Sequence, residues 1–234
     1  MTGPECRFTQ RVGTDADDAR LDGAAFHRNR EPIGDAVADA LGGRSGDVLE
    51  IGSGTGQHVV ALAERFSANT WWPTDYEPKH VESVEAWRLH AGLDNIRQAV
   101  QLDAAAEHWA AGPGAETEAA GGAVEGDLAG ILVVNVLHIS PFVVTRGITA
   151  GAGRRLAPGG RLMIYGPFMR DGHHTADSNR RFDQSLKSQN PAWGLRDTGV
   201  VTVIAQAAGL ALVDIVQMPS NNLFLVFEKA AKQA

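Results

Sequence analysis

The clearest chemical signal in the chain is a glycine-rich loop, in which residues 50–56 read Glu-Ile-Gly-Ser-Gly-Thr-Gly. The loop follows a short apolar strand at residues 47–51, and Val59, Ala63 and Phe66 then lie on one helical face. Glycines at such a strand-to-helix turn let the backbone approach a ligand where a Cβ atom would clash. We therefore predict that the loop binds a ligand; the alternative is a tight turn without one. The predicted contacts are Gly52, Ser53, Gly54 and Gly56.

Two acidic residues follow the next two predicted strands. Asp75 comes after a strand near residues 70–73, and Asp103 comes after a strand at residues 96–102. In open α/β sheets, ligands bind outside the carboxyl ends of the strands, at the point where the strand order reverses. We expect Asp75 to accept both hydroxyls of a ribose and Asp103 to accept from an adenine amino group, because an ionised carboxylate only accepts hydrogen bonds. A turn-capping role is the alternative for each.

The spacing of the glycines distinguishes three kinds of nucleotide-binding loop. A dinucleotide fingerprint requires Gly-x-Gly-x-x-Gly, but the third position counted from Gly52 is Gln57, and Gly56 falls one residue early. A P-loop ends in Gly-Lys-Ser/Thr, and no lysine lies near this loop. The loop instead resembles the glycine motif of class I S-adenosylmethionine-dependent methyltransferases. This resemblance implies S-adenosylmethionine as the cofactor, and the spacing of the glycines makes a dehydrogenase the least favoured interpretation.

The elements that carry these residues alternate between strand and helix. Residues 131–137 form a continuous apolar run, which is typical of a strand buried on both faces of a parallel sheet. Strands at 212–216 and 223–227 are close enough to pair antiparallel. This pattern predicts one doubly wound α/β domain. The resemblance implies a mostly parallel seven-stranded sheet with an antiparallel C-terminal strand, the Rossmann-like methyltransferase fold. Helices are expected over 32–41, 78–90 and 140–156, and a further strand over 161–165.

The predicted domain spans residues 26–230. Residues 1–25 have no apolar periodicity and carry an acidic cluster, so we expect a loosely ordered N-terminal arm. Residues 111–127 are rich in glycine, alanine and glutamate, which predicts a flexible surface loop.

Six short segments narrow the resemblance. They are Arg-Asn-Arg-Glu-Pro-Ile at 28–33, Gly-Thr-Gly-Gln-His at 54–58, Asn-Val-Leu-His-Ile-Ser-Pro at 135–141, Tyr-Gly-Pro-Phe at 165–168, Trp-Gly-Leu-Arg-Asp at 193–197 and Met-Pro-Ser-Asn-Asn at 218–222. Together, from about Asn29 to Phe227, they are similar to the methyltransferase-like protein 26 family, a branch of the class I methyltransferases. The arm and the 111–127 loop depart from the family pattern, so no function is carried onto them. The resemblance implies the fold and the cofactor and leaves the substrate open.

Three further residues are candidates for cofactor contacts. By resemblance, Glu50 supports the loop and the methionine ammonium group, and a surface carboxylate is the alternative. Arg30 could bind the methionine carboxylate or an acidic substrate, or form a surface salt bridge. Asn135, at the end of the most buried strand, could hold either the backbone or the cofactor.

His138 and Tyr165 are the candidate catalytic residues. His138 lies just past the strand at 131–137, where an imidazole could act as a general base near neutral pH. The favoured alternative is a histidine bonded to a loop carbonyl or packed on the cofactor. Tyr165 could orient the acceptor or simply fill a strand position. Positioning and desolvation supply much of the rate of methyl transfer, so a dedicated base is not required.

Asp171, His173 and His174 follow the fifth strand, where these enzymes place substrate contacts. With Arg180 and Arg181 nearby, the segment could recognise an anionic acceptor, or it could be a solvated loop. Adjacent histidine side chains rarely converge on one ion, and no third histidine or cysteine lies at ligand spacing, so no metal site is predicted.

Composition limits the remaining functions. The 234 residues are 44% apolar and 21% charged, which is ordinary for a soluble globular domain. A net charge of -7 argues against broad nucleic-acid binding. Cys6 is the single cysteine, which excludes a disulfide framework and a cysteine-built zinc site. The sequence has neither an apolar run of membrane length nor a signal peptide, so we expect a cytoplasmic protein without a membrane partner.

These observations give a working hypothesis. We expect an S-adenosylmethionine-dependent methyltransferase that transfers a methyl group to a small-molecule acceptor by in-line displacement. The alternatives are an RNA or protein methyltransferase, which a basic segment at 170–187 keeps open, and a non-catalytic scaffold that binds the cofactor. The methylated atom and the oligomeric state stay open.

Overall fold

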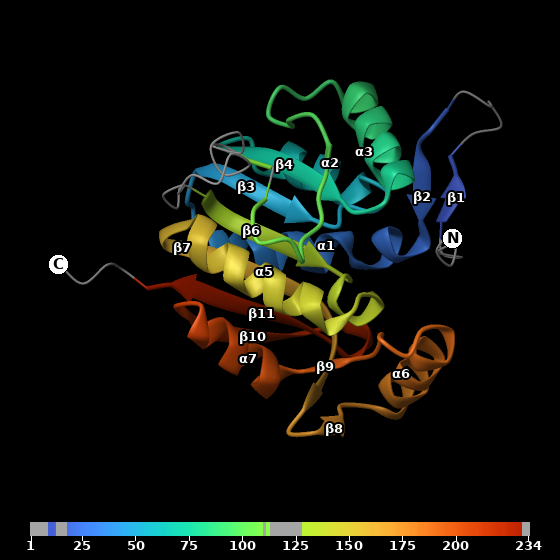
Figure 1. Ribbon diagram of the computed structural model, residues 1–234. Coiled ribbons are helices and arrows are strands. Elements are labelled where there is room, and N and C mark those ends of the chain that lie inside the picture. Colours follow the sequence, from blue (N-terminus) through green and yellow to red (C-terminus); the bar gives the residue numbers. More distant parts are fainter. Residues whose placement is uncertain (1–8, 13–17, 110, 113–127, 231–234) are drawn as a thin grey trace.

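The computed structural model describes residues 9–12, 18–109, 111–112 and 128–230. Its centre is a sheet with the strand order β5-β4-β3-β6-β7-β11-β10 (Figure 1). Neighbours from β5 to β7 pair in parallel, whereas β11 is antiparallel to both β7 and β10. This confirms the predicted mostly parallel seven-stranded sheet with an antiparallel C-terminal strand. The strands are β3 Gly46–Ile51, β4 Asn69–Asp75, β5 Val100–Gln101, β6 Leu128–Val134, β7 Leu156–Arg170, β10 Leu210–Met218 and β11 Asn222–Lys229. Two short strands, β8 (His173–His174) and β9 (Arg196–Asp197), also pair with β7 but lie outside this seven-strand order.

Helices cover both faces of the sheet (Figure 1). On one face, α1 (Ala24–Leu41), α2 (Gln57–Arg65) and α3 (Pro78–Ala91) enclose a core around Trp71. On the other face, α5 (Phe142–Arg155) and α7 (Thr198–Ala207) enclose a second core around Trp109. A further helix, α6 (Asp177–Gln189), lies beyond the carboxyl ends of the strands (Figure 1).

The strand β6 explains why its sequence is apolar throughout. Ile131 and Val133 belong to the core under α5, whereas Leu132 and Val134 belong to the core under α1. Because successive strand residues point to opposite faces, burial of both faces requires an apolar residue at each position. The strand ends at Val134, three residues earlier than expected, since Asn135 has a left-handed φ of 58° and the 3₁₀ turn η1 (Leu137–Ile139) follows.

The helix α1 begins at Ala24, whereas the sequence predicted a start at Pro32, which lies inside the helix. The apolar stripe of Ile33, Val37 and Leu41 continues backwards by one turn to Asn29, which is also buried. A polar residue at a stripe position interrupts the apolar periodicity, so the sequence pattern hides the first turns of the helix.

The described part of residues 1–25 differs from the expected loosely ordered arm. Thr9–Arg11 (β1) pairs with Leu21–Gly23 (β2), and β2 is bonded to the domain. The Leu21 N–H donates to Ser83 Oγ at 2.8 Å, and Trp87 Nε1 donates to the Leu21 carbonyl at 2.9 Å. These partners lie more than 60 positions away in the sequence, so local composition does not reveal them. Residues 1–8 and 13–17 lie outside the described part.

Other element boundaries differ slightly from those that the sequence predicts. β5 covers only Val100–Gln101, and Ile96 makes an isolated bridge to Trp71. Of the predicted loop at 111–127, only Ala111 and Gly112 are described, and Ala111 is buried. None of the helices in the described part of the chain combines the length and apolarity that a membrane span requires.

Candidate functional site

The glycine loop lies at the carboxyl end of β3, where the strand order reverses between β3 and β6. Gly52, Gly54 and Gly56 have φ values of 76°, 58° and 91°. A Cβ on Gly52 would lie 2.4 Å from Val136 Cγ2, and one on Gly56 would lie 2.7 Å from Val84 Cα. A Cβ on Gly54 would meet no atom within 4 Å. The outer glycines are therefore required for packing, and Gly54 faces open space where a ligand can approach.

Hydrogen bonds fix the loop against β4. The N–H groups of Gly52 and Ser53 both donate to the Thr74 carbonyl, at 2.9 Å and 2.8 Å. The Thr74 N–H in turn donates to Ser53 Oγ at 3.2 Å. Ser53 therefore holds the neighbouring strand, and its predicted ligand contact stays a prediction.

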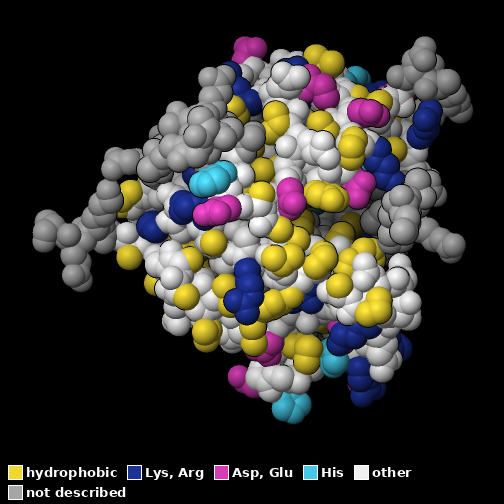
Figure 2. Space-filling view, in the orientation of Figure 1, with side chains coloured by type: hydrophobic (Ala, Val, Ile, Leu, Met, Phe, Trp, Pro, Cys, Tyr) yellow, Lys and Arg dark blue, Asp and Glu magenta, His cyan; other side chains and the backbone are white. Residues whose placement is uncertain are grey.

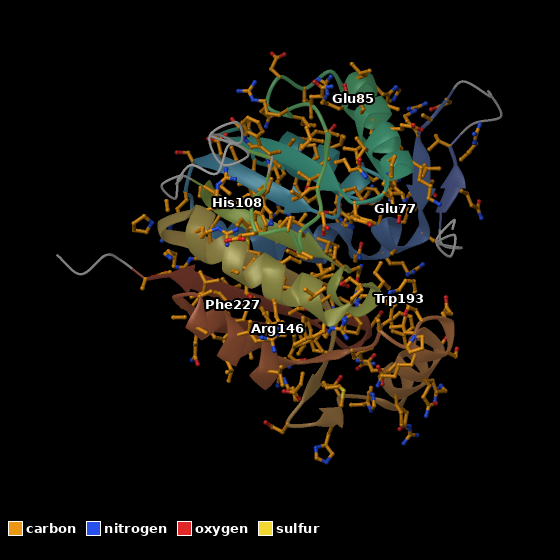
Figure 3. All side chains as sticks on the ribbon, in the orientation of Figure 1. Glu77, Glu85, His108, Arg146, Trp193 and Phe227 are labelled. Carbon is orange, nitrogen blue, oxygen red and sulfur yellow. The ribbon has the colours of Figure 1, made fainter. Side chains whose placement is uncertain are left out.

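The Asp75 carboxylate is hydrogen-bonded to the glycine loop. Its Oδ2 accepts from the Gly54 N–H at 2.8 Å, and its Oδ1 accepts from the N–H of Glu77, which Figure 3 labels, at 2.9 Å. His80 Nδ1 lies 3.2 Å from Oδ1. The turn-capping role is thus realised. Each carboxylate oxygen can accept more than one hydrogen bond, so ribose binding stays a prediction.

Asp103 lies beside Asp75, because the Leu102 N–H donates to the Asp75 carbonyl at 2.9 Å. The Asp103 side chain is exposed, and its Oδ1 accepts from the Ala105 N–H at 2.9 Å. The turn role is again present, and the carboxylate keeps a face open to solvent.

Glu50 is the most unusual group of the site. The residue is 1% exposed, and its Oε2 has no hydrogen-bond partner among the described residues. Burial raises the pKa of its carboxyl to about 7; a hydrogen bond from Ser53 opposes this rise, and the charge of Asp75 adds to it. Glu50 is therefore no surface carboxylate. A buried oxygen without a partner is suited to a cationic group.

The ends of β6 and β7 bring a second group of residues together. The Asn135 N–H donates to the Tyr165 carbonyl at 2.9 Å. A Cβ on Gly166 would lie 3.4 Å from His138 Nδ1 and 3.8 Å from Asn135 Oδ1. The missing side chain of Gly166 thus leaves space beside two polar side chains.

His138 is packed rather than solvated. The residue is 6% exposed, and its ring meets Phe182 of α6 edge-on, with the ring centroids 5.5 Å apart. Burial, assisted by the charge of Arg196, lowers the pKa of His138 to about 4. The imidazole is therefore neutral at physiological pH.

Sequence reasoning did not single out Arg196 as a site residue. Its buried guanidinium donates to the Gly194 carbonyl at 2.9 Å and to the Ser140 carbonyl. Ser140 follows the turn that carries His138, so Arg196 fixes this turn. The partner carbonyl lies 56 positions away, and the sequence offers no signal for it beyond the Trp-Gly-Leu-Arg-Asp segment.

Tyr165 is buried, with 3% of its surface exposed, and its hydroxyl oxygen accepts a hydrogen bond from Asn222 Nδ2 at 2.9 Å. Burial raises the pKa of Tyr165, although hydrogen bonds from Asn29 and Asn222 oppose the rise. Asn29 and Asn222 were not among the predicted site residues. Arg30, which was, has an exposed side chain that pairs with Glu31 at 3.1 Å, so its cofactor contact stays a prediction.

Asp171, His173 and His174 lie near one another after β7, but their side chains have different partners. Asp171 has a φ of 50° in the turn after β7, and its carbonyl lies 2.7 Å from His173 Nδ1. His174 Nε2 points instead to Asp183 Oδ2, 3.0 Å away. Burial alone would raise the pKa of Asp183, but hydrogen bonds from Lys187, Leu195 and His174 lower it. A cavity of about 310 Å³ lies here, lined by Gly172, His173, His174, Ala176, Asp177 and Arg180.

A second cavity, of about 470 Å³, lies between the first turns of α5 and α7. Hydrophobic side chains gather over these helices (Figure 2), and Val203 is 66% exposed. Arg146, labelled in Figure 3, places its guanidinium 5.3 Å from the centre of the Phe142 ring. Neither cavity includes a residue of the glycine loop.

The strand order, the antiparallel β11 and the loop after β3 define the Rossmann-like methyltransferase fold, and solved structures agree. An O-methyltransferase family protein from Burkholderia thailandensis matches with a TM-score of 0.70 at 16% identity, over 89% of this chain and 58% of that one. The mitomycin 7-O-methyltransferase MmcR matches with a TM-score of 0.66 at 18% identity, over 88% and 56%. The S-adenosylmethionine-dependent methyltransferase SibL matches with a TM-score of 0.62 at 17% identity, over 88% and 58%.

The chain thus spans little more than half the length of these three proteins, and at such identities the likeness shows the fold. A family model described as a protein of unknown function, DUF938, matches residues 21–229. The chain belongs to this family.

Proposed function

We propose that the protein is an S-adenosylmethionine-dependent methyltransferase that transfers a methyl group to a small-molecule acceptor. The observation that carries the proposal is Glu50, a buried carboxylate with an unpaired oxygen beside the glycine loop. Such a group is costly in the free protein and favourable when a cation approaches. The methionine ammonium of the cofactor is a cation that would satisfy it.

The other residues of the loop fit the same cofactor. Gly54 leaves open space where the backbone faces the ligand, since a Cβ there would meet no atom within 4 Å. Asp75 ends β4 and Asp103 follows the neighbouring β5, and they would accept from the ribose hydroxyls and the adenine amino group. When bound, S-adenosylmethionine supplies an electrophilic methyl group on a sulfonium.

The acceptor end of the site lies over β6 and β7. Neutral His138 has a pKa of about 4 and is a weak base, so it would help to position the acceptor rather than remove its proton. Arg196 holds the turn of His138 through the Ser140 carbonyl, and Phe182 shields the ring from water. Desolvation and positioning of the acceptor would then supply much of the rate.

Three considerations support a small-molecule acceptor. The matched structures include O-methyltransferases, and one of them is a mitomycin 7-O-methyltransferase. The net charge of -7 disfavours nucleic acid. The sequence motifs resemble the methyltransferase-like protein 26 family, and we place the chain in that branch and in the cytoplasm as part of this proposal.

Calorimetric titration with S-adenosylmethionine and S-adenosylhomocysteine, with NAD as the control, tests the cofactor. We expect micromolar binding of the first two and none of NAD. A labelled-methyl assay with pooled small molecules then tests turnover. Absence of binding to both adenosyl compounds contradicts the proposal, whereas binding without transfer to any pool favours the scaffold alternative.

A further inference from the structure

Three polar side chains meet where α1, β7 and β11 come together at the carboxyl edge of the sheet. Tyr165 is 3% exposed and Asn29 is 7% exposed. Asn222 Nδ2 donates to the Tyr165 hydroxyl oxygen at 2.9 Å and lies 3.2 Å from the Pro219 carbonyl. The Asn29 side chain approaches the same Tyr165 hydroxyl. The three side chains form what we call the amide–tyrosine cluster.

The hydrogen bonds of the cluster are incomplete. The Tyr165 oxygen accepts a hydrogen bond from the Asn222 amide, and no residue in the described part of the chain accepts the Tyr165 hydroxyl hydrogen. The Asn29 Oδ1 is buried and has no partner among the described residues. Buried polar groups in native proteins are almost always paired. A donor and an acceptor left open side by side therefore indicate the place of a ligand.

Left-handed backbone conformations surround the same cluster. Ser220 and Asn221, which immediately precede Asn222, have φ values of 60° and 59°. Asn135, whose N–H donates to the Tyr165 carbonyl, has a φ of 58°. Asparagine tolerates the left-handed region, whereas for Ser220 this conformation is unfavourable and persists mainly where the surrounding structure imposes it.

The strained turn is also bonded to α6. The Asn221 carbonyl accepts from Asn179 Nδ2 at 2.9 Å. The same helix carries Phe182, which packs on His138. The turn that places Asn222 on Tyr165 is thus fixed to the helix that covers the opposite side of the acceptor end.

We propose that the amide–tyrosine cluster binds a neutral hydroxyl group of the methyl acceptor, an inference that rests on the proposed function. A hydroxyl group can donate to Asn29 Oδ1 and accept from the Tyr165 hydroxyl at the same time. A carboxylate has no hydrogen to donate, and an alkylammonium has no lone pair with which to accept. An ether or a thioether leaves the Asn29 oxygen unpaired. The proposal therefore assigns to the acceptor a hydroxyl group, as in an alcohol or a phenol.

Nuclear magnetic resonance of the full chain with ¹³C-labelled tyrosine rings tests the subsite. The sequence contains two tyrosines, and a Tyr76→Phe variant assigns the signal of Tyr165. The protein is titrated with phenol, and separately with anisole and benzoate, both with and without saturating S-adenosylhomocysteine. We expect phenol to shift the Tyr165 signal saturably. Anisole and benzoate should bind at least about tenfold more weakly, which is the effect of one hydrogen bond.

An Asn29→Leu variant separates a binding role from a structural one. Leucine keeps the volume and removes both the unpaired oxygen and the amide group beside Tyr165, so thermal stability should change little while the affinity for phenol falls about tenfold. A Tyr165→Phe variant should weaken phenol binding to a similar degree, followed by calorimetry, whereas the matched Tyr76→Phe variant should not.

Three results overturn the subsite: no shift of the Tyr165 signal with phenol, an equal shift with anisole, or unchanged phenol affinity in Asn29→Leu. The proposed function is judged separately, by calorimetric binding of S-adenosylhomocysteine to the same samples. Binding of that compound without a response to phenol leaves the cofactor assignment intact and removes only the hydroxyl subsite.

Discussion

Replacing Glu50 with glutamine should change the dependence of stability on pH. The buried carboxyl has its pKa raised from 4.5 to about 7, chiefly by desolvation. One pKa unit corresponds to about 1.4 kcal/mol, so ionisation of this group costs the cofactor-free folded protein about 3 kcal/mol. The residue is 1% exposed, so solvent provides little screening of this cost.

The sign follows from the protons that each state binds. Between pH 4.5 and about 7, the folded protein keeps the Glu50 proton and the unfolded chain has lost it. The free energy of unfolding contributed by this group therefore falls as pH rises through that window, and it is constant above it. Because glutamine does not titrate, Glu50→Gln should gain about 3 kcal/mol over the wild type between pH 4.5 and pH 8.

Urea denaturation of the cofactor-free protein at several pH values measures this difference. The comparison uses the change with pH, so any constant effect of the buried amide cancels. Glu82→Gln, on an exposed position of α3, controls for the loss of one negative charge. Parallel stability curves for the wild type and Glu50→Gln across the window would refute the argument that Glu50 is an unpaired buried carboxylate.

Three further perturbations test the site. Asp75→Ala removes the acceptor of the Gly54 N–H and the expected ribose contact, so S-adenosylmethionine affinity should fall by about 1.5–3 kcal/mol in calorimetry; unchanged affinity rules out the ribose role. Both Gly54→Ala and Gly56→Ala put alanine at a left-handed φ, but only Gly56→Ala also places a Cβ 2.7 Å from Val84 Cα, so it should lower the melting temperature more than Gly54→Ala does. Gly54→Ala, whose Cβ meets no atom within 4 Å, should weaken cofactor binding; equal losses of stability in the two variants contradict this division. His138 has a pKa lowered to about 4, so the turnover rate should show no inflection from this group between pH 6 and 8, and His138→Ala should lower turnover more than cofactor affinity. Equal losses of turnover and affinity indicate packing alone.

The sequence predicts the frame of the fold well because its signals are local. The apolar run of β6 predicts a buried strand, the glycines after β3 predict a turn, and the short connection before Asn222 predicts an antiparallel pair. The start of α1 is missed because Asn29 occupies a buried position on the apolar stripe. The polar side chain of Asn29 gives no sign in the sequence that tertiary contacts bury it.

The site itself is less predictable, for a related reason. Asp75 and Asp103 are recognised by their places after strands, but their hydrogen bonds to backbone N–H groups depend on turn geometry. Arg196 contacts a carbonyl 56 positions away, and Asn222 contacts a hydroxyl 57 positions away. Such partners become visible only when the chain is folded. The contact of His174 with Asp183, nine positions away, is likewise absent from the sequence pattern.

Because β3 pairs with β6, the centre of the sheet cannot form until β6 has been synthesised. Val48 of the central strand pairs with Gly130, and contacts over such sequence distances form slowly because a long loop must close first. Gly52 packs on Val136, beyond the end of β6, so the glycine loop reaches its final packing only after that segment is in place. Until then, β3 has an unpaired edge that can join other chains. During synthesis, a ligand of the glycine loop would therefore stabilise the chain only after β6 has been made.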